Sequence, residues 1–126
     1  MSSLFVYGTL LRGEERDGFV SHLEARPASI TGRLWRVPAG YPALELPPNG
    51  VPIKGEVLQL DNPSILVALD LIEGVSQGLY ERKQVQVQTA QGHQSAWVYV
   101  MNPSQLRQSG CVLLKGNDWR RYSRRK

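Results

Sequence analysis

The sequence contains very little of the chemistry that disulfides and metal sites require. Among 126 residues there are one cysteine and two histidines, which excludes an internal disulfide and argues against a Cys/His zinc site. Cys111 lies in the apolar stretch "CVLL", and this favours a buried, inert thiol over a nucleophile paired with His22 or His93. We therefore expect neither a metal nor a catalytic cysteine.

Long hydrophobic runs are also missing. No apolar segment approaches the ~20 residues that cross a bilayer, and the N-terminus "MSSLFVYG" lacks the basic-then-apolar order of an export signal. The expectation is a cytoplasmic protein without a membrane partner. With 41% hydrophobic and 21% charged residues, a chain of this length can bury one core.

The positive charge is concentrated near the C-terminus. The formal net charge is +4, yet residues 115–126 ("KGNDWRRYSRRK") alone hold six basic side chains against one acidic side chain. Trp119 and Tyr122 interleave with this charge, as in some nucleic-acid contacts, but terminal basic runs are more often solvated extensions. We predict one domain over 1–119, a basic tail over 120–126 and no nucleic-acid partner.

Strand-like patterns dominate the rest of the chain. β-favouring and alternating residues predict strands at 3–8, 29–36, 52–60, 80–89 and 94–101. The last two form a hairpin in this interpretation, because "QVQVQT" alternates strictly and "AQGHQ" supplies a turn containing glycine. The segment 36–50 holds so many prolines and glycines that we expect a long loop.

One segment has a strong helical pattern. In "DNPSILVALDLIEG", Asp61 or Asn62 can cap the N-terminus, Pro63 suits the first turn and Gly74 can end the helix. We predict a helix over 63–73 and a weaker one over 16–23. The predicted fold class is α+β, a small mixed β-barrel with packed helices, although a parallel βαβ crossover remains compatible with the pattern.

The helical pattern nominates one carboxylate for chemistry. At about 100° per residue, Glu73 lies between Leu69 and Leu66 on the apolar face, whereas Asp70 lies outside that face. Burial beside the negative end of the helix is expected to raise the pKa of Glu73, as a general base requires. The alternative is a helix that frays before Glu73, leaving its side chain to solvent or to Arg82 or Lys83.

The first predicted strand ends in the turn "YGTL" at residues 7–10. Gly8 would allow the backbone to approach a ligand closely, and the amides of Thr9 and Leu10 could then meet an anion. A simple turn with no ligand is the alternative. The sequence lacks the glycine spacing of a P-loop or of a dinucleotide fingerprint, and it contains no GxSxG or HExxH motif.

Several motifs taken together resemble the γ-glutamylcyclotransferase-like family. They are, in order, "FVYGTL" at 5–10, "GYPAL" at 40–44, "GEVLQL" at 55–60, "LDLIEGVSQGLYERKQVQV" at 69–87 and "AWVYV" at 96–100, with "GNDWRRY" near the end. Each motif is short, but their order and spacing over residues 4–101 are specific.

This resemblance implies an enzyme that needs no cofactor. The α-amine of a γ-glutamyl amide attacks its own γ-carbonyl, which closes the lactam 5-oxoproline and expels the amine. An α-amine with a pKa of ~8 must lose a proton before it attacks, and the departing amine must gain one. By resemblance, Glu73 is the acid/base, and Tyr7, Gly8, Thr9 and Leu10 bind the substrate.

Other substrate-binding residues are carried over with the family motifs. Tyr41 and Pro42 are expected at the pocket mouth, and Tyr80 and Tyr99 are expected to contribute hydroxyls or walls. Each tyrosine could equally be a packing residue with one hydrogen bond. A different class of function stays open, since the same cavity could bind an amino-acid-like metabolite without turnover. The sequence indicates neither the leaving amine nor the oligomeric state.

Overall fold

The computed structural model describes residues 3–8, 23–38, 40, 42–46, 49–62, 64–73, 75–77, 80–107 and 110–119. Its strands are β1 (Ser3–Val6), β2 (Ala25–Arg36), β3 (Pro42–Glu45), β4 (Val51–Gln59), β5 (Glu81–Thr89), β6 (Gly92–Val100) and β7 (Val112–Leu113). Its helices are α1 (Ser64–Ile72), a 3-10 turn (Val75–Gln77) and the single turn α2 (Pro103–Leu106).

Five strands close into a barrel. The hydrogen-bonded order is β2, β4, β1, β6 and β5, and a further pairing of β2 with β5 through Ala28 and Thr89 joins the two ends. The sheet is mixed, because β1 runs antiparallel to β4 and parallel to β6. The predicted α+β class and mixed β-barrel are therefore confirmed, with α1 as the main helix.

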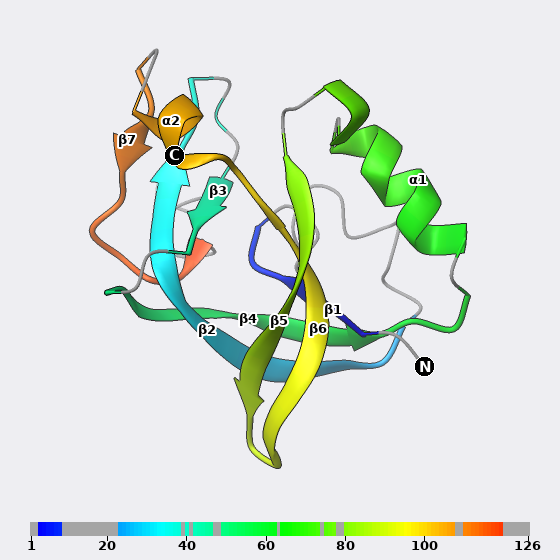
Figure 1. The fold of residues 1–126 in the computed structure, drawn as a ribbon. Coiled ribbons are helices and arrows are strands. Elements are labelled where there is room, and N and C mark those ends of the chain that lie inside the picture. The colour runs from blue at the N-terminus through cyan, green and yellow to red at the C-terminus, as the bar shows by residue number, and fades with distance from the viewer. Residues whose placement is uncertain are drawn as a thin grey trace.

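The long strand β2 organises the barrel. Its first part pairs with β4 from Ala25 to Gly32, and its last part pairs with β3 from Arg33 to Arg36. In Figure 1 this strand curves through the molecule, so that β3, β7 and α2 gather on one side of the β5–β6 hairpin and α1 lies on the other.

A glycine permits a close contact between two strands of the barrel. A Cβ on Gly55 of β4 would overlap the Val6 carbonyl oxygen and the ring of Phe5. Both β1 residues are buried, with Phe5 1% exposed and Val6 3% exposed. The glycine therefore lets β4 lie directly against Phe5 and Val6 of β1.

The predicted strands and helix lie close to those of the structure. The expected hairpin is β5 paired with β6 from Glu81–Val100 to Thr89–Gly92. The expected helix over 63–73 is α1, and the Ser64 amide donates to Asn62 Oδ1 at 3.0 Å, which identifies Asn62 as the N-cap. The weaker helix predicted over 16–23 falls almost entirely outside the described residues, as does the basic tail over 120–126.

Two expectations about local structure are wrong. The segment 36–50 is not all loop, because Pro42–Glu45 forms β3, a strand with all four residues buried. Proline at the first position of this edge strand costs no ladder hydrogen bond, so the proline-rich composition concealed it. Cys111 is only half-buried, and the Val112 and Leu113 that follow it are about half exposed.

Within the described residues, no helix is long and apolar enough to cross a membrane.

The core consists of buried side chains from β1, β2, β4, β6 and α1, together with Trp119 near the C-terminus, which is 3% exposed. Because Trp119 packs in this core, its ring is not available to stack on a nucleic-acid base.

Candidate active site

Tyr7 directly follows β1 and connects this strand to β6. Its side chain is 7% exposed, and its hydroxyl donates a hydrogen bond to the backbone carbonyl of Tyr99 at 2.7 Å. The ring also stacks against Phe5, with centroids 6.4 Å apart. This tyrosine therefore lies at a fixed position in the barrel interior.

The glycine after Tyr7 packs against β3. A Cβ on Gly8 would overlap Cγ of Pro42, so the missing side chain lets the backbone after β1 lie close to Pro42. The expected approach of a ligand to Gly8 stays a prediction. Thr9, Leu10 and Tyr41 lie outside the described residues. The proposed cradle of backbone amides therefore remains a prediction.

Pro42 is joined to a second predicted site residue. The hydroxyl of Tyr80, a half-buried residue just before β5, donates to the Pro42 carbonyl at 2.7 Å. Tyr80 also lies close enough to Tyr7 for its charge to contribute to the raised pKa of Tyr7. Tyr7, Gly8, Pro42 and Tyr80, which come from three separate sequence motifs, thus gather in one region.

Glu73 follows the last residue of α1 and remains within its hydrogen-bonding pattern. Its amide donates to the Leu69 carbonyl at 2.8 Å, so the helix does not fray before Glu73. The side chain is half-buried, and its charge contributes to raising the pKa of both Tyr7 and Tyr99. The Glu73 carboxylate therefore lies within electrostatic reach of both tyrosines.

The tyrosine hydroxyls of this region are held in their neutral form. Burial is the main reason why the pKa of Tyr7 lies well above its ordinary value. Burial also raises the pKa of Tyr99, and the hydrogen bond to Asp70 raises it further. At neutral pH both side chains are phenols that can donate one proton each.

Sequence reasoning missed two members of the cluster, Asp70 and Arg82. Arg82 Nε donates to Asp70 Oδ1 at 2.8 Å and Arg82 Nη2 donates to Oδ2 at 3.1 Å, which makes a bidentate ion pair. Tyr99 donates to the same Oδ1 at 2.7 Å. Asp70 lies one helical turn before Glu73, but the helical pattern placed it outside the apolar face, so no local signal in the sequence indicated these contacts.

The structure brings together most of the residues that the sequence nominated. Contacts link Tyr7, Gly8, Pro42, Tyr80 and Tyr99, and Glu73 lies within electrostatic reach of Tyr7 and Tyr99. A separate hollow of about 550 Å³ lies among β2, β4 and β5, and none of the nominated residues lines it. In the described part of the chain, no group of three or more His, Cys, Asp or Glu side chains could hold a metal ion.

Comparison with known proteins shows which family the chain belongs to. Residues 4–121 match the family model described as "Gamma-glutamyl cyclotransferase, AIG2-like". The chain belongs to this γ-glutamyl cyclotransferase family. The family motifs between residues 5 and 100 thus fall within one continuous match that includes Tyr7, Glu73 and Tyr99, and the members that give the family its name are enzymes.

Individual relatives agree with the family match. The chain is 30% identical over 128 residues to the γ-L-glutamyl-butirosin B γ-glutamyl cyclotransferase of Niallia circulans. This alignment covers 97% of the chain and 78% of that relative. An AIG2-like protein from Mus musculus has a similar structure, with a TM-score of 0.68 and 26% identity over 86% of this chain and 84% of that one.

The same fold also occurs within longer chains. YkqA from Bacillus subtilis superposes with a TM-score of 0.77 and 27% identity. That similarity covers 99% of this chain and 43% of YkqA, so the γ-glutamyl cyclotransferase fold described here spans less than half of that relative.

Proposed function

We propose that this protein releases 5-oxoproline and an amine from γ-glutamyl amides, with Glu73 as the general acid/base. The observation that carries the proposal is the position of Glu73 at the end of α1, within electrostatic reach of Tyr7 and Tyr99. The family match supports the reaction type. The relative that acts on a γ-glutamyl butirosin supports an amine as the leaving group.

The reaction requires a single group that takes a proton and then returns it. Glu73 removes a proton from the α-ammonium of the substrate, and the freed amine attacks the γ-carbonyl carbon. Glu73 returns this proton to the leaving nitrogen as its C–N bond breaks, and then carries the second proton of the attacking nitrogen to the departing amine, which leaves as an ammonium ion. Atoms balance without water or cofactor, because the amine of the substrate is the nucleophile and the lactam is the product.

The surroundings of Glu73 suit this role. Burial raises the pKa of Tyr7 and Tyr99. Both phenols therefore keep their protons near neutral pH, and they neither take a proton from Glu73 nor give one to it. Rigid attachment of Tyr7 to β6 and of Tyr80 to Pro42 keeps the surrounding groups in place. Such preorganisation favours an intramolecular attack, in which geometry accounts for much of the rate.

The test is turnover of a panel of γ-glutamyl amides, with 5-oxoproline detected by mass spectrometry. The panel includes γ-glutamyl amino acids, γ-glutamyl-ε-lysine, γ-glutamyl polyamines and a γ-glutamyl aminoglycoside. We expect the Glu73→Gln variant to lose about 10²- to 10⁴-fold in kcat. Glu24→Gln is the matched control, because it removes an exposed carboxylate that is paired with Arg26 at 3.1 Å.

Each outcome has a distinct meaning. Turnover by the native protein that Glu73→Gln abolishes and Glu24→Gln retains supports both the reaction and its base. Equal turnover by all three proteins removes Glu73 from the assigned role. Binding of a γ-glutamyl amide without any product identifies a binding protein and contradicts the proposed reaction.

A further inference from the structure

The Asp70 carboxylate connects α1 to both strands of the β5–β6 hairpin. It accepts two hydrogen bonds from Arg82 of β5 and one from the hydroxyl of Tyr99 of β6. The side chains of Asp70 and Arg82 are 26% and 25% exposed. The Arg82 guanidinium also lies over the ring of Trp97, at 4.4 Å from the ring centroid.

These contacts determine what the Tyr99 hydroxyl can do. A phenol has one proton, and Tyr99 donates it to Asp70 Oδ1 at 2.7 Å. The remaining lone pairs of this oxygen can only accept. Tyr99 is therefore an acceptor toward any other group that enters the site near Glu73.

The ion pair also controls the local charge. Asp70 lies three residues before Glu73 on the same helix, and a second uncompensated carboxylate there would repel the first. The bidentate contact with Arg82 offsets the charge of Asp70. The neutral oxygen of Tyr99 and the carboxylate of Glu73, which lies within electrostatic reach of Tyr99, then remain as two acceptors in this region.

An α-ammonium group matches this pair of acceptors, because it presents three N–H donors and one positive charge. We propose, on the basis of the function proposed above, that Tyr99 accepts a hydrogen bond from the α-amino group of the substrate. Asp70 and Arg82 are then positioning residues, which act through Tyr99 by fixing the direction of its hydroxyl. Their role is specificity for a free α-amine next to Glu73.

The test compares two compounds that differ only in the α-amine. The first is the best γ-glutamyl amide of the panel, measured by kcat/KM. The second is the matching glutaryl amide, which lacks the α-amine and cannot cyclise, measured by its inhibition constant. The proteins are the native chain, Tyr99→Phe, Asp70→Asn, the double variant, and Glu24→Gln as the control.

We expect Tyr99→Phe and Asp70→Asn each to lower kcat/KM by about 10- to 100-fold, the loss of one hydrogen bond to a charged group. The inhibition constant of the glutaryl amide should change by less than about 2-fold, because that compound has no amine to bind. In the double variant, Asp70→Asn should add less than about 2-fold to the effect of Tyr99→Phe. A general loss of structure would weaken both compounds alike.

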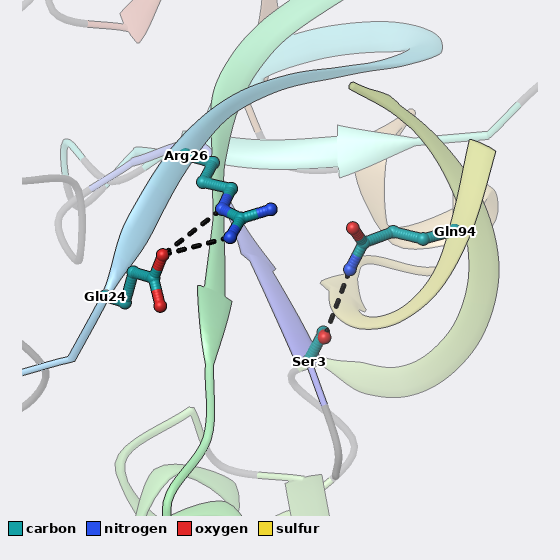
Figure 2. A network of polar contacts seen from close by, with 4 residues as sticks. All are labelled: Ser3, Glu24, Arg26 and Gln94. Carbon is teal, nitrogen blue, oxygen red and sulfur yellow. Dashed lines mark hydrogen bonds and ion pairs between the residues drawn. The ribbon is translucent and has the colours of Figure 1, made fainter. Parts of the chain in front are cut away.

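The control carboxylate is well placed for this comparison. Figure 2 shows the ion pair between Glu24 and Arg26. It also shows the hydrogen bond that Gln94 donates to Ser3, with a distance of 3.1 Å. Ser3 begins β1, whereas Tyr7 follows the end of that strand. Glu24→Gln therefore breaks an Arg–carboxylate pair without touching the cluster around Asp70.

Several results would overturn the proposal. One is a native-like kcat/KM for Tyr99→Phe or Asp70→Asn; another is an equal loss of affinity for both compounds. Full additivity in the double variant shows that Asp70 does not act through Tyr99. If Asp70→Asn does not fold, Tyr99→Phe with the two compounds decides, since it keeps the Asp70–Arg82 pair. If the native chain cyclises no γ-glutamyl amide, the proposed function itself is wrong, and the inference about Tyr99 that rests on it is wrong as well.

Discussion

At the scale of single residues, Tyr7 has two roles that are measurable separately. It packs among buried side chains, and its hydroxyl supplies the hydrogen bond to the Tyr99 carbonyl. Burial raises the pKa of Tyr7 well above the value of about 10 found in an unfolded chain. A raised pKa means that the folded protein keeps this proton at a pH where the unfolded chain loses it.

This difference predicts how stability depends on alkaline pH. Below about pH 10 both states hold the Tyr7 proton, and its contribution to stability is fully present. As the pH rises further, only the unfolded chain ionises, so the free energy of unfolding falls by up to about 1.4 kcal/mol per pH unit from this residue. Urea unfolding between about pH 9 and pH 11 measures the slope.

The comparison for this prediction is Tyr7→Phe. This variant lacks the ionisable group, so its unfolding free energy should fall less steeply above about pH 10. It should also be less stable than the native protein at neutral pH by about 1–3 kcal/mol, because the Tyr99 carbonyl loses its donor. Identical alkaline slopes for the two proteins would contradict a raised pKa at Tyr7.

At the scale of elements, the contact between the end of β1 and the start of β3 sets the geometry of the site. We expect Gly8→Ala to destabilise the protein by about 1–3 kcal/mol, because the new methyl group would overlap Cγ of Pro42. Activity should fall with it, since Pro42 also holds Tyr80. Urea unfolding and turnover of a γ-glutamyl amide measure the two effects.

A second substitution tests that mechanism directly. Pro42→Ala removes the Cγ atom, so Gly8→Ala should cost less in that background than in the native one. Gly116→Ala is the matched control, because a Cβ at Gly116 meets nothing within 4 Å. A cost of Gly8→Ala that is unchanged in the Pro42→Ala background would mean that the overlap with Pro42 is not the cause.

The elements differ in how well their sequences predicted them. α1 and the β5–β6 hairpin have local signals, namely the Asn62 cap, the apolar spacing and the strict alternation in β5. β3 has no such signal, because it becomes a strand by pairing with Arg33–Arg36 of β2 and not by its own composition. The β7 pairing is equally non-local, and "CVLL" could not reveal that Val112 and Leu113 stay half exposed.

The candidate site shows the same division. Glu73, Tyr7 and Tyr99 came from motifs and helical spacing, which are visible along the chain. The role of Asp70 depends on Arg82 and Tyr99, which lie 12 and 29 residues away. No local pattern identifies such partners, because the barrel closure brings them together.

At the scale of the whole molecule, closure of the barrel makes distant segments depend on one another. β2 pairs with β4, β5, β3 and β7, and Trp119 packs into the core that these strands enclose. Glu73 directly follows α1, Tyr99 lies in β6 and Tyr7 directly follows β1. The site should therefore persist only while the whole barrel is folded, and residues 1–119 are predicted to unfold as one unit.

Trp119→Ala tests this cooperativity. Removing a large core side chain that is 3% exposed should lower the free energy of unfolding by about 3–5 kcal/mol. If the domain is one unit, circular dichroism and the fluorescence of Trp35 and Trp97 will report the same lowered midpoint in urea. Trp119→Phe, which leaves a smaller cavity, should lose less stability. Separate transitions for the two probes would mean that the C-terminal segment unfolds independently of the barrel that holds Glu73.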